Sequence, residues 1–116
     1  MTISFDEFKK MDIRIGTIKE VVAVPDADKL LCCQVDFGEV DESGIGKLRQ
    51  IVSGIREFYP DVNILVNKQV LYILNLEPRK IKGYESNGML MAVDGIDGKP
   101  VFLVPEIFVG VGSKVR

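Results

Sequence analysis

The stretch DIRIGTIKEVVAVPDADKLLCCQVDF, residues 12–37, contains the two segments that decide the fold. In its second part every other residue from Leu31 to Phe37 is apolar, which is the period-two pattern of a β-strand with one buried face. The alternation predicts that Cys33 is buried and that Cys32 faces outward with Gln34. The sequence therefore indicates a strand that covers a core on one side only.

The first part of the stretch is longer and predicts a bent strand. Ile13 and Ile15 share one face, but beyond Gly16 the apolar residues change phase to Ile18 and the valines that follow. A change of phase at a glycine is typical of a β-bulge, so we expect one long strand with a bulge at Gly16. The turn-forming residues PDAD at 25–28 end this strand.

The remainder of the chain reads as short strands and turns. Ser4-Phe-Asp-Glu7 fits a capping box and predicts a short helix over about 5–11. Many short strands with short links predict an all-β protein, a five-stranded Greek-key barrel of the OB type over residues 1–116, with an extra C-terminal strand and tail. Further strands are expected at about 48–53, 68–76, 88–94 and 101–104, with a hairpin loop at 38–47, a helical turn at 57–60 and a turn at 94–98.

Composition narrows the classes of function. The 116 residues carry a net charge of −2, so any site for a polyanion must be a local patch. There is no histidine, which removes the most common general base and the most common zinc ligand. The two cysteines are adjacent, which does not fit the spacing of a zinc site, and we expect packed thiols with no metal, no cofactor and no disulfide. No motif supports catalysis.

The sequence also lacks the marks of a membrane or secreted protein. No apolar stretch approaches the roughly 20 residues of a membrane span, and the N-terminal residues MTISFDEFKK carry acids without an apolar signal core. We therefore expect a cytoplasmic protein with no membrane partner.

The two most polar connections fall beside the usual binding face of the OB fold. That fold binds ligands on its second and third strands, flanked by the loops that follow its first and fourth strands. PDADK (25–29) would be the first of these loops and RKIKGYESNG (79–88) the second. The second loop has three cations within four residues, and Pro78 restrains its start. These cations fit phosphate contacts, but the composition also fits a solvated loop with a turn at Asn87-Gly88.

Five strings in this order resemble one known family. They are DIRIGTI (12–18), PDADKL (25–30), IVSGI (51–55), NLEPRKIKGYES (75–86) and NGMLMA (87–92). They resemble the tRNA-binding domain found at the C-terminus of methionyl-tRNA synthetases and in structure-specific tRNA-binding proteins.

The resemblance implies an OB fold, a homodimer, and binding of tRNA by shape with little reading of its sequence. It also implies a role as, or alongside, a synthetase C-terminal domain, with a synthetase catalytic subunit as a further partner. A related branch of the fold acts as an export chaperone that binds peptides, but that branch lacks DADKL and SNGM. The contacts that the resemblance implies are Lys29, Arg79, Lys80, Lys82, Ser86, Asn87 and Met89.

Apolar residues on both faces of three segments point independently to a dimer. These segments are 70–74, 89–93 and 101–104, and the tail VPEIFVGVG (104–112) adds more apolar surface without an evident place in the barrel. A barrel needs only its inner face to be apolar, so the outer faces predict a partner surface. The acidic insert DESGIGK (41–47) lengthens the second hairpin.

Overall fold

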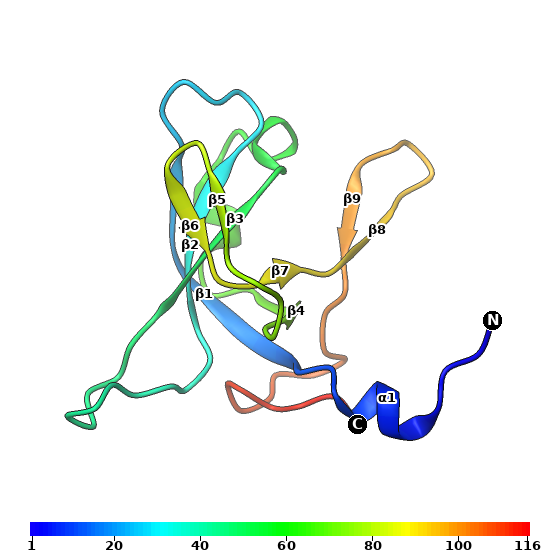
Figure 1. The fold of residues 1–116 in the computed structure, drawn as a ribbon. Helices are drawn as coiled ribbons and strands as arrows, with labels where there is room; N and C mark the ends of the chain where they lie inside the picture. The colour runs from blue at the N-terminus through cyan, green and yellow to red at the C-terminus, as the bar shows by residue number, and fades with distance from the viewer.

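A five-stranded antiparallel sheet forms the centre of the computed structural model, which describes residues 1–116. The spatial order of the strands is the one expected for an OB barrel, and the predicted fold class is confirmed (Figure 1). In the order β3-β2-β1-β4-β7, the strands are Arg49–Ser53, Leu31–Asp36, Ile13–Ala23, Gln69–Ile73 and Met89–Leu90.

The long first strand, β1, pairs with two neighbouring strands. Its first half pairs with β4 and its second half pairs with β2, and the register shifts between Ile18 and Glu20. The bulge therefore lies after Ile18, and its predicted position at Gly16 is wrong. Gly16 has a different role, because a Cβ atom there would lie 2.5 Å from the side chains of Val35 and Phe37. The glycine allows β2 to pack closely against β1.

The barrel is nearly closed by contacts between β3 and the segment that leads into β7. The backbone N–H of Asn87 donates to the carbonyl of Gln50 at 2.9 Å. One residue earlier, the hydroxyl of Ser86 accepts a hydrogen bond from the N–H of Val52 at 3.0 Å. These two bonds join the edge strands of the sheet.

The core lies inside the barrel and contains the residues that the alternation in β2 predicts. Leu31, Cys33 and Val35 are each at most 1% exposed, and Phe37 meets Tyr72 edge to face with 5.4 Å between ring centroids. Leu65, on the short 3-10 helix η2 (Val62–Leu65), is fully buried at one end. The expected helical turn occurs one residue early, as η1 (Arg56–Phe58).

The N-terminal helix α1 (Phe5–Lys9) has the capping box that the sequence predicts. The hydroxyl of Ser4 accepts a bond from the Glu7 N–H at 3.1 Å, and the Ser4 N–H donates to the Glu7 carboxylate at 3.2 Å. The helix ends two residues before its expected limit. No helix of the protein has the length and apolar character that crossing a membrane would require.

The fifth predicted strand, 88–94, is divided in two. The Met91 N–H still donates to the carbonyl of Leu71 at 3.0 Å, but beyond it the chain leaves the barrel. It continues as β8 (Ala92–Asp94), which pairs with β9 (Pro100–Phe102) in a separate ribbon (Figure 1). The turn predicted at 94–98 joins these two strands.

The chain that follows the apolar tail pairs with β1, whereas Ile107 and Phe108 within the tail stay exposed. The Ile15 N–H donates to the Ser113 carbonyl at 2.9 Å, and the Val115 N–H donates to the Ile13 carbonyl at 2.8 Å. This C-terminal segment thus occupies the edge of β1 that β2 leaves free. Gly112 (φ +80°) lies so close to Phe37 that a Cβ atom would overlap the Phe37 carbonyl oxygen.

Candidate nucleic-acid interface

The basic segment after β4 is a β-hairpin and not an irregular loop. It consists of β5 (Arg79–Ile81) and β6 (Tyr84–Ser86), joined by Lys82 and Gly83. Both turn residues have positive φ angles, 52° and 84°, as in the two-residue type I′ turns that suit the twist of paired strands. The turn therefore lies at Lys82-Gly83, and the alternative of a turn at Asn87-Gly88 is wrong.

The hairpin is fixed to the outer face of the barrel by a second, small core. Ile81 and Tyr84 pack against a cluster formed by Val24, Ala27, Cys32 and Val52. Cys32 points away from the main core, as predicted, but it is only 2% exposed because the hairpin covers it. Cys32 thus faces outward from the barrel and is packed beneath the hairpin. The sequence does not predict this packing, because β5 and β6 are short and too few of their residues are apolar to form a periodic pattern.

Both thiols are free and shielded from solvent. Burial raises the pKa of Cys32, and burial together with the neighbouring Cys32 raises the pKa of Cys33 to about 12. Both side chains are therefore protonated at neutral pH, and they act as small apolar packing residues.

Ser86 anchors the base of the hairpin. Its side chain is 6% exposed, accepts the Val52 N–H and donates to the Gly88 carbonyl at 3.1 Å. Its hydroxyl is therefore used within the protein. Gln50 supports the same strand, because its side-chain amide donates to the Glu85 carbonyl at 3.0 Å.

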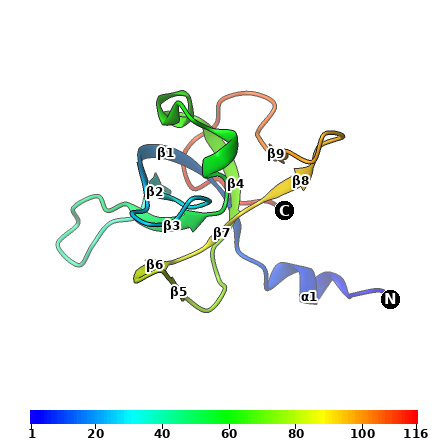
Figure 2. The same cartoon turned by 90° about the horizontal axis from the view of Figure 1, so that it is seen from above.

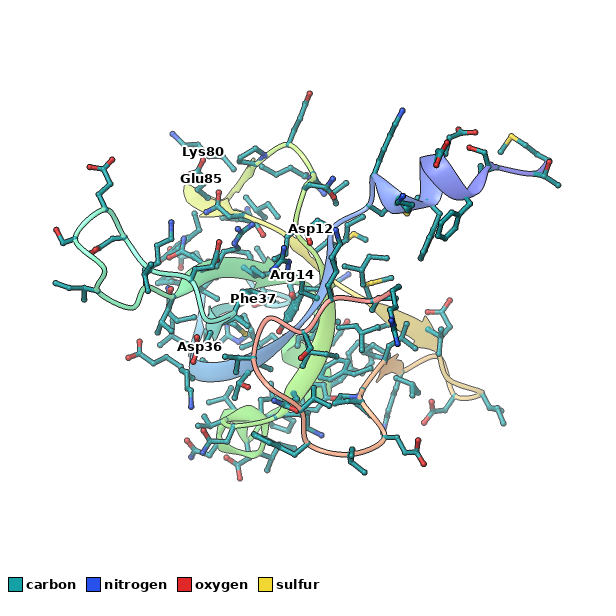
Figure 3. All side chains as sticks on the ribbon, turned by 90° about the horizontal axis from the view of Figure 1, so that it is seen from below. Asp12, Arg14, Asp36, Phe37, Lys80 and Glu85 are labelled. Atoms are coloured by element: carbon teal, nitrogen blue, oxygen red, sulfur yellow. The ribbon has the colours of Figure 1, made fainter.

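The three cations of the hairpin are exposed and unpaired. The protein has two ion pairs, Arg14 with Asp12 and Arg49 with Glu39, and neither involves the hairpin. Figure 3 shows Lys80 beside Glu85, its partner in the hairpin register, on the rim of the molecule. The exposed cations Arg79, Lys80 and Lys82 are thus held on a rigid frame with no carboxylate bound to them.

The structure brings Lys29 to the tip of this hairpin. Lys29 and Lys82 line the same hollow of about 330 Å³, together with Asp26 and Asp28 of the loop between β1 and β2. Both segments lie at the upper end of the barrel in Figure 1. The two connections singled out from the sequence therefore form one continuous surface, although their charges are mixed at the point where they meet.

The other predicted contact residues lie at the base of the hairpin. Met89 is 52% exposed and lines a small hollow of about 80 Å³ together with Arg79 and Ser86. Asn87 is half-buried and lines a larger hollow of about 400 Å³ on the face of β2 and β3. The six exposed or half-buried residues of the predicted set thus lie along one side of the barrel, and the seventh, Ser86, supports them from below.

Arg49 supports the candidate interface, and its sequence context gives no sign of this role. Its guanidinium contacts both Glu39 oxygens, Nε to Oε1 at 3.0 Å and Nη2 to Oε2 at 2.7 Å. Its Nη1 donates to the carbonyls of Leu74 and Asn87 at 3.2 and 3.1 Å, and the group lies 5.8 Å from the Phe37 ring centroid. The guanidinium of Arg49 is therefore bound to Glu39 and to two backbone carbonyls, and it orders the backbone at Asn87.

Glu39 gives this arrangement a dependence on pH. The hydrogen bond from Arg49 lowers the pKa of Glu39 below its ordinary value of 4.5. A group with a lowered pKa stabilises the fold fully above its unfolded-state pKa, and this stabilisation is lost as the pH falls through the folded-state pKa.

We expect Glu39→Gln to lower the free energy of unfolding at neutral pH, with a deficit that narrows as the pH falls below the ordinary carboxyl pKa of 4.5. Urea denaturation at several pH values measures the deficit. Glu85→Gln is the control, because Glu85 belongs to no ion pair. A Glu39→Gln deficit that stays constant as the pH falls below 4.5 would contradict the assignment.

The acidic insert is directed away from the cations. The connection between β2 and β3 extends outward from the barrel on a different side from the hairpin, as Figure 2 shows. At its tip the Asp41 carboxylate accepts the backbone N–H groups of Ser43 and Ile45 at 2.8 and 3.0 Å. One of the acidic groups of the insert is thus used to form its turn.

Comparison with known proteins gives this surface a context. Residues 13–114 match a family model described as "Putative tRNA binding domain". The chain is 47% identical over 114 residues to a methionine--tRNA ligase of Parabacteroides distasonis, a match that covers 98% of this chain. It covers only 16% of that relative, so the chain spans about a sixth of the length of the curated protein it matches.

Solved structures share the whole fold. A methionyl-tRNA synthetase-related protein (MetRS related protein) from Pyrococcus horikoshii is 32% identical with a TM-score of 0.85, and the match covers 100% of this chain and 99% of that one. A CsaA chaperone protein from Picrophilus torridus is 26% identical with a TM-score of 0.81, and the match covers 99% and 100% of the two chains. The same barrel thus occurs in a protein named as related to methionyl-tRNA synthetase and in one named as a chaperone.

Proposed function

The chain belongs to the family of tRNA-binding domains, as its sequence motifs indicated, and from this premise we propose that it is a non-catalytic module that binds tRNA by its shape. The observation that carries the proposal is the basic hairpin. Three exposed cations without ion-pair partners stand on a frame that is packed against the barrel. RNA helices are recognised mainly through phosphates and 2′-hydroxyls, which needs cations at fixed positions more than it needs base readers.

The proposed contacts divide into three kinds. Arg79, Lys80 and Lys82 contact phosphates, and Lys29 extends this row from the neighbouring loop. Met89 and Asn87, at the base of the hairpin, contact sugars or exposed bases. Ser86 positions the hairpin, since its hydroxyl is bonded to β3 and to Gly88.

The overall net charge of −2 does not conflict with this proposal. Electrostatic attraction is screened over about 8 Å at physiological ionic strength, so the local surface matters more than the total. The loop between β2 and β3, which carries the acidic insert, extends from a different side of the barrel than the hairpin (Figure 2). A local positive surface is therefore compatible with an acidic chain.

The biological setting is also a proposal. Since the relatives are methionine--tRNA ligases of which this chain matches about a sixth, we propose that it works in the cytoplasm as, or alongside, the C-terminal domain of such an enzyme. The catalytic domain would then lie elsewhere, and this module would raise the local concentration of tRNA near it.

A peptide-binding chaperone is the second candidate, because the fold is shared with a CsaA chaperone protein. Exposed apolar side chains such as Ile107 (73%) and Phe108 (76%) favour it. The two proposals are separated by gel-shift and fluorescence titrations with bulk tRNA and with a hydrophobic peptide. If tRNA binds and the peptide does not displace it, the tRNA module is supported. If the peptide binds tightly and tRNA does not bind, the proposal is overturned.

We further propose a homodimer whose two protomers hold one tRNA. The argument from β4 is weaker than the sequence indicated, because Val70 and Tyr72 are buried and the opposite face of this strand is half-buried within the same chain. The remaining support comes from the β8–β9 ribbon and the tail. Exposed apolar residues there are Val93, Val101, Val104, Ile107 and Phe108.

Light scattering at micromolar concentration tests the dimer. We expect twice the mass of one 12.9 kDa chain, and Phe108→Asp should shift the particle towards the monomer because a charge in an apolar interface is costly. Ile45→Asp, at an exposed apolar residue of the insert between β2 and β3, is the matched control outside this surface. A wild-type particle of one chain that still binds tRNA tightly would rule out the dimer as the binding unit.

A further inference from the structure

The hollow on the outer face of β2 and β3 differs in chemistry from the basic hairpin beside it. It has a volume of about 400 Å³, within the range of pockets that hold small organic groups. We infer that it receives one unpaired nucleobase, held through the side-chain amides of Gln34 and Asn87; this inference rests on the proposed function. Its lining residues are Gln34, Glu39, Lys47, Leu48, Arg49, Gln50 and Asn87.

The electrostatics of the hollow do not suit a phosphate. Arg49 would be the natural phosphate ligand, but it is bonded to both oxygens of Glu39 and to two backbone carbonyls. A phosphate placed there would meet the carboxylate of Glu39, which is ionised at neutral pH since Arg49 lowers its pKa. Lys47 is the remaining cation of the lining. The hollow therefore suits a polar group without charge.

The free hydrogen-bonding groups match the edge of a base. Gln34 donates one side-chain N–H to Gln50 Oε1 at 3.0 Å, which leaves its second N–H and its own oxygen without a protein partner. A free donor and a free acceptor on one planar amide can form two parallel bonds with a base. Gln50 cannot turn to compete, because its amide nitrogen donates to the Glu85 carbonyl. The pairing of the two glutamines thus fixes Gln34.

Asn87 and Leu48 complete the hollow. The Asn87 side-chain amide has no hydrogen bond within the protein, while its backbone is fixed by bonds to Gln50 and Arg49. Leu48, which is 42% exposed, supplies an apolar surface for the face of a ring. Hydrogen bonds from a base to this free amide would offset the cost of removing its water.

This site would select unpaired bases and not a particular base. Every base carries a donor next to an acceptor on its pairing edge, so one amide can bond to any of them, but in a duplex these groups are already paired. The hollow would therefore favour tRNA loops or single-stranded ends over continuous helix, as is typical of RNA readout. It complements the hairpin, which contacts phosphates irrespective of pairing.

The test compares Asn87→Ala and Gln34→Met with the wild-type chain in binding bulk tRNA and a fully paired RNA duplex. Asn87→Ala removes no hydrogen bond within the protein, and Gln34→Met preserves the volume of the side chain. We expect each variant to bind tRNA about tenfold more weakly, with an unchanged dependence on salt. Binding to the duplex should be unchanged. Arg79→Ala is the control that should weaken both and reduce the salt dependence.

A second measurement separates this inference from the proposed function. Adding cytidine, which has no phosphate, should shift the side-chain amide resonances of Gln34 and Asn87 in the NMR spectrum, and ribose alone should not. If Asn87→Ala and Gln34→Met keep full affinity for tRNA, the base site is overturned. The same holds if their binding becomes less dependent on salt, as is expected for Arg79→Ala. Neither result would contradict the proposal that the chain binds tRNA. If the wild-type chain binds no RNA, the proposed function is overturned. The NMR shifts on adding cytidine would then still show whether the hollow binds a base.

Discussion

Replacing Arg79, Lys80 and Lys82 together with alanine is expected to lower the affinity for tRNA by about two orders of magnitude at moderate salt. The three cations carry no ion pair that would offset their loss. Each phosphate contact releases counterions, so the slope of log affinity against log salt should fall by roughly two to three units in total. Filter binding or fluorescence anisotropy over a series of salt concentrations measures both quantities.

The control is a triple alanine variant of Lys9, Lys10 and Lys99, which changes the net charge by the same amount. These residues lie on or after α1 and in the turn before β9, two elements that lie to the right of the hairpin in Figure 1. The hairpin variant should keep its structure because Ile81 and Tyr84, its anchoring residues, are unchanged. Equal losses in the two variants would show that net charge alone matters, and an unchanged hairpin variant would show that the hairpin does not bind tRNA.

Phe37→Ala is expected to lower the free energy of unfolding by about 3–5 kcal/mol. Phe37 is 4% exposed, lies edge-on to Tyr72, and is packed against the glycines at 16 and 112. The truncated side chain would leave a cavity between β1, β2 and the tail that these rigid strands cannot fill. For a domain of about 100 residues a loss of this size corresponds to a fall of more than about 10 °C in Tm.

Phe5→Ala is the matched control, because Phe5 is 70% exposed and lies on α1 outside the barrel. We expect its effect to stay within about 0.5 kcal/mol. Urea denaturation should be performed at a concentration where light scattering gives all variants the same mass, since association adds to apparent stability. Equal effects of the two substitutions would contradict the placement of Phe37 in the core.

Several elements could be predicted because their signals are local. The alternation from Leu31 to Phe37 identifies β2 and its buried face, and the capping box at Ser4 and Glu7 identifies α1. The cations of the hairpin are equally evident in the sequence. Each of these signals comes from residues that are close together in the sequence, so it can be recognised without knowledge of the fold.

Other elements depend on partners that are distant in sequence. Nothing near Val115 indicates that it pairs with Ile13, and nothing near Cys32 indicates that Ile81 and Tyr84 cover it. The hairpin strands have three residues each, which is too short for an apolar period to be recognised.

The site was likewise only partly predictable. The sequence placed Lys29 and Lys82 on two loops, but their common hollow is a property of the folded barrel. The ion pair between Arg49 and Glu39 could not be predicted either, because the sequence does not show which arginines are paired with a carboxylate in the folded chain. The resemblance implies that Ser86 is an RNA contact, and the sequence gives no sign that its hydroxyl is bonded to Val52 and Gly88 within the folded chain.

The hydrogen bonds that join β3 to residues 86 and 87 have a kinetic consequence. They involve the amide protons of Val52 and Asn87, and they lie directly beneath the surface proposed to bind RNA. Proteins open locally at such junctions, and amide protons exchange with solvent only while the junction is open. A bound tRNA would hold both edges of the barrel together. The exchange rates of these two protons therefore report occupancy from inside the protein, without any label on the RNA.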